Sequence, residues 1–519
     1  MSGAIQAGVG KVDITCREEG TQCELLSEKT RAHIPREFWD KKIEVDDPLF
    51  VRALVLDDGV QKLVLITMDV TAVGCRSISQ YILNDSADDF MPNLRGRILN
   101  ELGIPGANVT VSASHTHPPG RLLVDDDAQL DRTMEAILQA LQNMTPVTIG
   151  VGTGHEERLT FNRTLMLKNG RDCTTRGCWP PLPDEDIEGL RPIDPEIGVL
   201  RIDRPDGTPL AVVYNFACHL LLGTHKYVIT ADWPGVASQY LEDHIGGDVM
   251  AMFVQGALGD TAEIEKNDLE HPKSCHGIGT AMGESVLKAY RKIKEPSESA
   301  EPSKPALKVA STTVEFPLRT DIPDVIADMQ RESAELMASL RYTSLNFKSF
   351  LPLYLKYKLH PDFPSHQPFR YMQAEHAGNL GFVTMDERNR LFIDKYLESL
   401  AAMETMARNE EDIATLAKHQ EIIDDIGAPT VSAEIQAIRI ADAVLITAPM
   451  EILAETGMKI KQESPHEHTF IAAICNGYLH YAPPASYYPR GGYEVTECLL
   501  APEWESIFET AVKELLTQL

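Results

Sequence analysis

The sequence predicts an α/β fold with mixed β-sheets, interrupted by a helical insertion. Two stretches, 48–70 with Asp47 directly before it and 194–219, share one design: Asp-Pro, an apolar strand, an Asp-Gly turn and a second apolar strand. An Asp-Gly pair between apolar runs is a strong hairpin signal. A third stretch, 323–425, carries apolar residues near the helical period with charged residues between them. The hairpins predict two related halves of a sheet system, and the third stretch predicts the insertion.

The remaining elements follow in chain order. Apolar patterning predicts helices at 77–101, 127–143 and 501–519 and strands at 248–255, 430–450 and 468–481. The stretch 295–305 is interpreted as a linker because it is rich in Pro, Ser and Glu and has no apolar periodicity. We therefore expect an α/β domain from residues 1–295 and 427–519, and a linker with a helical insertion at 296–426.

Composition limits the partners and the location. The chain of 519 residues has 48 Lys+Arg against 77 Asp+Glu, a formal net charge of -29. This charge repels nucleic-acid phosphates and anionic lipid headgroups, so neither nucleic acid nor a membrane is an expected partner. No apolar run approaches the ~20 residues that span a bilayer, and the first residues lack the features of a secretory signal. A cytoplasmic protein is expected, with its nine cysteines mostly reduced.

Four apolar strands end in side chains that can bind a metal. VSASHTH contains His115 and His117, VVYNFACH ends in His219, AVLITAPME ends in Glu451, and IAAICNGYLHY ends in Tyr481. Each signal is weak alone, because a lone strand-end histidine is more often structural and Pro-Met-Glu is also a helix start. Strand ends of α/β proteins collect at one rim of a sheet, so the four together predict a shared site.

At these residues the sequence resembles the neutral (non-lysosomal) ceramidase family, over nearly the whole chain. GVGKVDIT resembles the opening strand of the family, SASHTHPPG its histidine motif, and NFACH with TADWPGVAS the segment of its second zinc histidine. FVQGALGD resembles its nucleophile-loop strand, APMEI its glutamate motif and CNGYLHY its tyrosine motif. Six motifs in the right order are specific as a group, and they imply a ceramidase-like α/β catalytic domain with a strand-end metal site.

The resemblance also implies roles for individual residues. It places the zinc ligands at His115, His219, Glu451 and Tyr481. It makes His117 a second active-site histidine, Arg163 the active-site arginine, and Tyr493 a tyrosine that stabilises the developing oxyanion. Imidazole and carboxylate are ordinary donors to Zn²⁺, which lowers the pKa of a bound water toward ~7.

Three departures from the family separate this chain from true ceramidases. Ala262 stands where the family has a serine held to be its nucleophile, and we expect the neighbouring Thr261 not to replace it. Residues 118–121 replace a Gly-rich stretch, and the sequence stops at Leu519 without the family's immunoglobulin-like domain. These differences predict a soluble relative with a changed substrate.

The leading hypothesis is a zinc-dependent hydrolase that cleaves a C–N amide bond of a small, soluble N-acyl-type substrate with metal-activated water. A zinc-dependent esterase or lactonase is an alternative, because the same tetrahedral chemistry serves both bonds. A non-catalytic metal-binding protein is a third interpretation, which the presence of His117, Arg163 and Tyr493 disfavours. The sequence leaves homo-oligomerisation open.

Overall fold

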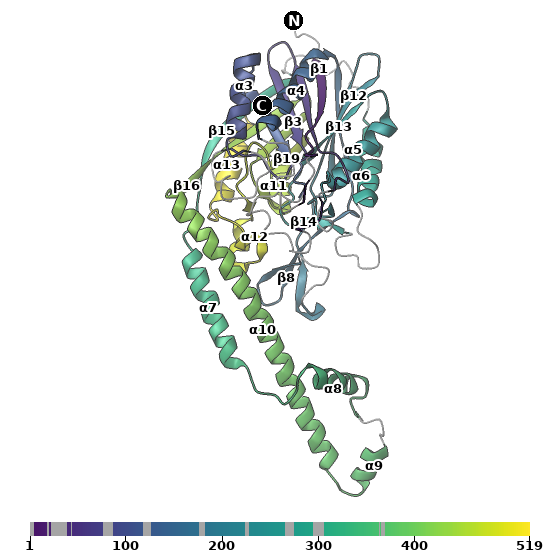
Figure 1. The fold of residues 1–519 in the computed structure, drawn as a ribbon, viewed down its shortest axis with the longest axis vertical. Coiled ribbons are helices and arrows are strands. Elements are labelled where there is room, and N and C mark those ends of the chain that lie inside the picture. Colours follow the sequence, from purple (N-terminus) through teal and green to yellow (C-terminus); the bar gives the residue numbers. More distant parts are fainter. Residues whose placement is uncertain are drawn as a thin grey trace. The chain divides into compact units, whose positions relative to one another are not determined.

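The computed structural model describes most of the chain. The described residues are 5–17, 20–21, 39–42, 44–75, 87–117, 126–175, 182–223, 228–264, 275–293, 306–362, 364 and 369–519. They divide into two compact units, of which unit 1 comprises Met1–Arg319 with Ile423–Leu519 and unit 2 comprises Thr320–Ile422. Figure 1 shows unit 1 as packed sheets with helices and unit 2 as helices alone.

Three sheets of four or five strands form the centre of unit 1. The first has the order β4-β3-β2-β1-β5, the second β13-β12-β11-β6 and the third β15-β16-β17-β19. The strands of the first sheet are β1 (Gln6–Asp13), β2 (Phe50–Asp57), β3 (Lys62–Met68), β4 (Val109–Ala113) and β5 (Thr145–Pro146). Those of the second are β6 (Thr148–His155), β11 (Glu196–Asp203), β12 (Pro209–Phe216) and β13 (Met250–Gln255). Those of the third are β15 (Leu307–Pro317), β16 (Thr430–Ile440), β17 (Ala443–Ala448) and β19 (His468–Ala473).

All three sheets repeat one motif, an antiparallel hairpin followed by a helix and a parallel strand. In the first, β2 pairs antiparallel with β3, and β3 pairs parallel with β4. The pairs β11–β12 and β16–β17 are likewise antiparallel, and each is extended by a parallel strand, β13 or β19. The intervening helices are α3 (Phe90–Leu102), α5 (Asp232–Ile245) and α11 (Ala454–Glu463). Because β3 and β4, like the other parallel pairs, run in the same direction, their carboxyl ends reach the same edge of the sheet.

The core lies between the sheets. Leu54, Leu200 and Leu445, one from each sheet, belong to a single buried apolar cluster. On its other side, the second sheet packs Trp233 of α5 and Met282 of α6 (Cys275–Tyr290). The burial of apolar side chains on both faces explains why these strands are nearly continuous apolar runs.

Helix α4 (Asp126–Gln142) packs closely against β1, and glycines in that strand permit the contact. A Cβ at Gly8 would lie 1.9 Å from the carbonyl oxygen of Ala140, and one at Gly10 would lie 2.0 Å from that of Ala136. Any larger side chain would push the helix off the sheet. The Gly-Val-Gly stretch is therefore a packing requirement of this strand.

Shorter elements complete unit 1. These are β7 (Thr160–Asn162), β8 (Thr164–Leu167), β9 (Asp172–Thr174), β10 (Ile187–Leu190), β14 (Thr261–Glu263), β18 (Glu451–Ile452), β20 (Tyr481–Ala482), α12 (Tyr493–Thr496) and α13 (Trp504–Leu516). No helix in the described part of the chain combines the length and the apolar character that a bilayer crossing requires.

Unit 2 is helical. It contains α7 (Ile322–Ser339), α8 (Phe347–Leu359), α9 (Phe369–His376) and most of α10 (Gly381–Ile426). Helices α7 and α10 lie side by side (Figure 1), and Asn409 donates hydrogen bonds to Glu332 and Ser333 across their contact.

The structure confirms the α/β class with mixed sheets. The hairpins turn at Gly59 and Gly207, whose φ values of 81° and 82° explain the Asp-Gly pairs. The predicted strand 468–481 is wrong in extent, because β19 ends at Ala473 and Ile474 and Asn476 have positive φ. The first part of the predicted helix 77–101, residues 118–121 and the linker 295–305 lie outside the described residues.

The division of the chain also differs from the expected insertion at 296–426. Strand β15 belongs to unit 1, because it pairs along its whole length, from Leu307 to Pro317, with β16. The helical unit therefore begins at Thr320, beyond this strand. The burial of β15 alternates and is only partial. Because the strand directly follows the linker, it was assigned to the insertion.

Candidate metal centre

Backbone pairing brings the four strand-end segments together. Thr116, between the two histidines of the first segment, forms a parallel bridge with Leu220, directly after His219. Strand β18 pairs parallel with β20 so that Glu451 stands opposite Tyr481. Main-chain pairing thus joins the segments of His115 and His219, and it joins those of Glu451 and Tyr481.

Each of the two fully buried histidines is held by main-chain carbonyls at Nδ1. His115 Nδ1 lies 2.8 Å from the carbonyl oxygen of Thr71, and His219 Nδ1 lies 2.9 Å from that of Leu258 and 3.0 Å from that of Thr261. A carbonyl oxygen only accepts hydrogen bonds, so each Nδ1 must carry the proton. In the neutral imidazole the Nε2 atom is then a lone-pair donor, the form in which histidine binds a metal.

The two Nε2 atoms meet a carboxylate. His219 Nε2 is 3.0 Å and His115 Nε2 is 3.5 Å from oxygens of Glu451, and all three side chains are at most 2 % exposed. Among the described residues, His115 Nε2 and Glu451 Oε2 have no hydrogen-bond partner. Buried acceptor atoms that face one another are strongly unfavourable unless a cation lies among them. This donor set fits a divalent metal.

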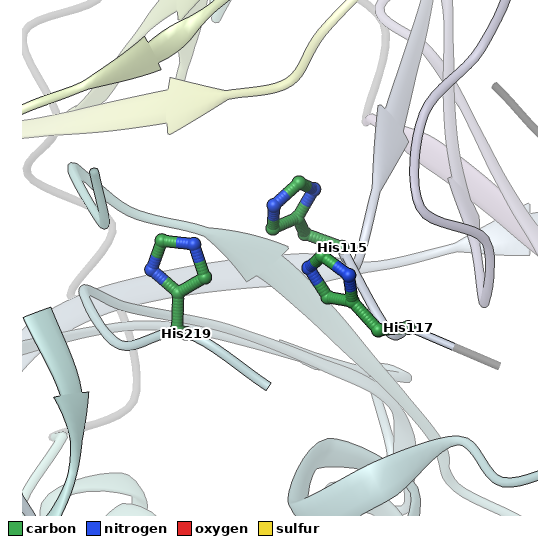
Figure 2. A group of neighbouring side chains, drawn as sticks. All are labelled: His115, His117 and His219. Atoms are coloured by element: carbon green, nitrogen blue, oxygen red, sulfur yellow. The ribbon is translucent and has the colours of Figure 1, made fainter. Parts of the chain in front are cut away.

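Three imidazoles surround this place. Candidate ligand atoms of His115, His117 and His219 all lie within 4.8 Å of one another, so that together they could hold a metal ion. Figure 2 shows the three side chains as neighbours that extend from two segments of the chain. Their ring centroids are 4.6 Å apart for His115 and His117 and 5.2 Å apart for His115 and His219.

Two tyrosines border the carboxylate and the imidazoles. Tyr478 donates a hydrogen bond to Oε1 of Glu451, which orients the carboxylate. The hydroxyl of Tyr481 lies 3.5 Å from His219 Nε2 and accepts a hydrogen bond of 3.0 Å from Nη2 of Arg163. Tyr481 therefore lies between the donor cluster and the guanidinium of Arg163.

Arg163 is fixed by three partners. Its Nε donates to Glu494 at 2.9 Å, and its Nη2 donates to the carbonyl oxygen of Gly259 at 2.7 Å as well as to Tyr481. Glu494 also accepts hydrogen bonds from Thr164 and Thr174, at 3.3 and 2.7 Å. Because both members of the ion pair are almost fully buried, the guanidinium has one orientation and keeps its charge.

The site residues differ in exposure. His115, His219, Glu451, Arg163 and Tyr481 are 5 % exposed or less, whereas His117 and Tyr493 are half-buried. The Tyr493 ring lies 5.4 Å from that of Tyr481 and 5.5 Å from the Arg163 guanidinium. The buried residues can hold a cation, and the half-buried residues can reach a substrate.

Burial and neighbouring charges shift the ionisation of these groups. Burial, together with the charge of Arg163, lowers the pKa of His219 to about 4, which keeps this imidazole neutral. Burial opposes ionisation of Glu451, but the adjacent histidines hold its pKa well below the usual value. Glu451 in turn raises the pKa of His115 although burial opposes this, so a divalent cation would displace a proton from that imidazole on binding.

The backbone is strained where it supports the site. His115 and His480 have φ values of 69°, in the left-handed region that residues with a side chain rarely adopt. His115 N donates to the carbonyl oxygen of Val70 at 2.9 Å, and Glu451 N donates to that of His480. Such conformations persist only where the surrounding structure imposes them, and they concentrate at functional sites.

The chain was compared with known protein families, curated proteins and solved structures. No protein-family model matches the chain, and no curated protein matches it significantly. Solved structures do match it, among them a neutral ceramidase from Pseudomonas aeruginosa (TM-score 0.58, 16% identity) and a ceramidase complexed with C2 (TM-score 0.59, 15% identity). In each case the match covers 99% of this chain and 75% of the other. The fold is ceramidase-like.

All seven residues that the ceramidase resemblance assigns to the site lie together in this structure. The set is His115, His117, Arg163, His219, Glu451, Tyr481 and Tyr493. Two further residues, Tyr478 and Glu494, contact this set but received no role from the sequence. Glu494 directly follows Tyr493, yet nothing in the sequence pairs it with Arg163, which lies 331 positions away.

The segment in which Ala262 is expected to replace a serine also borders the site. Ala262 lies in β14, is 1 % exposed, and accepts a hydrogen bond at its carbonyl oxygen from Thr160. The hydroxyl of Thr261 donates to the carbonyl oxygen of Leu258 at 3.0 Å. Thr261 therefore uses its hydroxyl within the segment itself.

Proposed function

We propose that the protein is a zinc-dependent hydrolase that cleaves a C–N amide bond of a small N-acyl-type substrate. The observation that carries this proposal is the convergence of His115 Nε2, His219 Nε2 and the Glu451 carboxylate, all buried and all acceptors. The ceramidase-like fold supports it, since the neighbours in structure space include a neutral ceramidase.

In this proposal His115, His219, Glu451 and Tyr481 hold the metal. Nitrogen and oxygen donors of this kind are ordinary zinc ligands. A bound zinc ion would act as a Lewis acid toward the water or carbonyl group of the reaction. The ligand set is supported by the carbonyl-bound Nδ1 atoms, which leave Nε2 of each histidine as the free donor.

The other residues act on the substrate. His117, half-buried beside His115, takes the proton from the attacking water and returns it to the leaving nitrogen. Arg163 and Tyr493 face the negative charge that develops on the carbonyl oxygen, because fixed donors stabilise such charge far better than mobile ones. Glu494 and Gly259 provide that fixation for Arg163.

A metal and substrate screen tests the proposal. The purified protein should contain one tightly bound equivalent of zinc, and it should hydrolyse N-acyl compounds until a chelator removes the metal. Matched amide and ester substrates with the same acyl group decide between an amidase and the esterase or lactonase alternative. Bound metal without turnover of any acyl compound would support the non-catalytic interpretation and overturn the enzymatic one.

A further inference from the structure

The exposed apolar residues of this protein are concentrated in unit 2. Among the described residues, twenty large hydrophobic side chains are exposed, and fourteen of them lie between Met337 and Met403. Unit 2, Thr320–Ile422, is much the smaller of the two units. Concentrations of this kind on a soluble surface mark interaction sites, whereas scattered single residues do not.

Helix α8 shows this concentration most clearly, because it has one packed and one exposed apolar side. Phe350 and Tyr357 are buried in a cluster with Ile393 of α10, and the Phe350 ring lies 4.4 Å from that of Tyr396. A capping box formed by Asn346 and Ser349 fixes the start of the helix. Helix α8 is thus a firmly held element of unit 2.

The exposed side of α8 carries an apolar strip, which we define as Phe347, Leu351, Leu355 and Leu359. These side chains are 66%, 41%, 48% and 72% exposed. They occur at every fourth position, and residues four apart are neighbours along one side of a helix. Tyr342, 86% exposed, precedes the helix. No residue in the described part of unit 2 buries this strip.

The same side of the helix is basic, in contrast to the chain as a whole. No Asp or Glu occurs from residue 336 to 361, where Arg341, Lys348, Lys356 and Lys358 are found, although the chain has a net charge of -29. At 3.6 residues per turn, Lys348 and Lys358 project within the arc of the apolar strip. Both are exposed.

We propose that α8 docks on an anionic lipid surface, with its apolar strip among the acyl chains and its lysines at the headgroups. Amphipathic helices that combine Leu and Phe with Lys lie in the membrane interface and bury their apolar face by about 5–10 Å. The lysine stems can extend along the apolar layer while their ammonium groups stay in water.

This inference opposes the expectation of no membrane partner, which rests on the total charge. Charges are screened over about 8 Å at physiological ionic strength, so the acidic surface elsewhere weakens the attraction at α8 only slightly. The local charge of the docking face therefore decides the contact. The inference does not depend on the proposed hydrolase activity.

A second copy of the chain fits the strip less well than lipid does. A two-fold contact is self-complementary, so the centre of the strip on one copy would meet the same strip on the other. Lys348 and Lys358 would then face lysines of the partner, and no acidic residue of α8 would offset them. An anionic membrane supplies both the apolar layer and the negative charge.

Vesicle flotation with the full-length protein tests the proposal. The protein should float with vesicles of phosphatidylcholine and phosphatidylglycerol and should bind pure phosphatidylcholine weakly. The double variant Leu351→Glu/Leu355→Glu should bind the anionic vesicles less by about tenfold or more. Lys348→Gln/Lys358→Gln should remove the preference for anionic over neutral vesicles.

A matched control places the same substitution on exposed apolar residues of unit 1. Val60→Glu/Leu190→Glu changes side chains that are 89% and 64% exposed, and it should leave vesicle binding unchanged. Circular dichroism checks that both double variants retain their helices. The proposal is overturned if the native protein does not float, if both double glutamate variants bind alike, or if sedimentation without lipid shows a dimer that Leu351→Glu/Leu355→Glu separates.

Discussion

Two places in unit 1 each contain a His–Glu pair and an Arg–Glu pair, but only one of them is a candidate metal centre. At the exposed end of β6, His155 lies 3.3 Å from Glu157 of the following loop, and the two side chains are 63% and 69% exposed. In the candidate metal centre, His219 lies 3.0 Å from Glu451, and the two side chains are 1% and 2% exposed. Water satisfies the first pair, whereas the second pair has to be satisfied by the protein and a cation.

The arginine pairs show the same contrast. Arg158, 75% exposed, contacts the buried Glu156 at 2.6 Å, whereas both Arg163 and Glu494, 4% and 3% exposed, are buried and lie 2.9 Å apart. An ion pair with one exposed member contributes less to stability, because water competes for the exposed charge. A buried charge has no such alternative, so loss of its partner has a large effect. Burial, and not contact distance, distinguishes the site from the loop.

Replacement of the histidine by alanine in each place should give the largest difference between the two places, measured as the amount of bound metal. His219→Ala removes a neutral Nε2 donor from the buried cluster, so the variant should lose its bound metal completely. His155→Ala removes an exposed imidazole and should retain a full equivalent. Elemental analysis after gel filtration measures both. A His219→Ala protein that keeps its metal would show that the ligand set is wrong.

Replacement of each arginine by lysine should separate catalysis from folding. A lysine at position 163 has one ammonium group and cannot reproduce the fork that joins Glu494, Gly259 and Tyr481. Arg163→Lys should fold and bind metal, yet kcat on an N-acyl substrate should fall by about 10²–10³, as for loss of an oxyanion donor. Arg158→Lys should leave kcat unchanged. Equal turnover in the two variants would remove Arg163 from the site.

Neutralisation of the glutamates should show a smaller difference, in stability. Glu494→Gln leaves the Arg163 charge buried without a counter-charge, which should cost about 3–5 kcal/mol of unfolding free energy. Glu157→Gln, on the exposed loop, should change that free energy by less than about 1 kcal/mol. Denaturant unfolding measures both. If the two variants unfold alike, water reaches the Arg163 pair and its burial has no energetic role.

The sequence predicted the candidate site residues, which lie together in the structure, but not the contacts that support them. His115, His219 and Glu451 follow the apolar strands β4, β12 and β17, which end at Ala113, Phe216 and Ala448. The rim where strands end is where an α/β fold collects side chains. Glu494 and Tyr478 act through contacts with residues 331 and 27 positions away, which no local pattern encodes. Long-range polar contacts of this kind follow from the completed fold.

The hairpins show a similar limit. The Asp-Gly turns at Gly59 and Gly207 predicted two of the three hairpins. The third, β16–β17, turns at Ala441 with a φ of 53°, a conformation that glycine favours and alanine adopts only when the structure imposes it. The strands of this hairpin were predicted, but its relation to the other two was not. A repeat that lacks its turn residue cannot be identified from turn chemistry.

The smallest effect is expected at Thr261, which is as buried as the metal ligands. Because Ala262 has no nucleophilic atom, we predict that water attacks the carbonyl directly and that no acyl-enzyme forms. The Thr261 hydroxyl is engaged with the carbonyl oxygen of Leu258, and that oxygen also accepts from His219. Thr261→Val therefore leaves no unpaired acceptor, and it should change stability by about 1 kcal/mol and turnover by less than about threefold.

Burial alone thus gives no role in this site, because we expect a buried hydroxyl that is already satisfied by its own segment to take no part in the reaction. Rapid quenching of the native enzyme with excess substrate, followed by intact mass spectrometry, should detect no acyl adduct. Product partitioning to added hydroxylamine after the leaving group has departed should also be absent. An adduct on Thr261 that disappears in Thr261→Val would establish a covalent route and would place this residue with the catalytic groups, because its hydroxyl would then have to leave Leu258 and reach the carbonyl carbon.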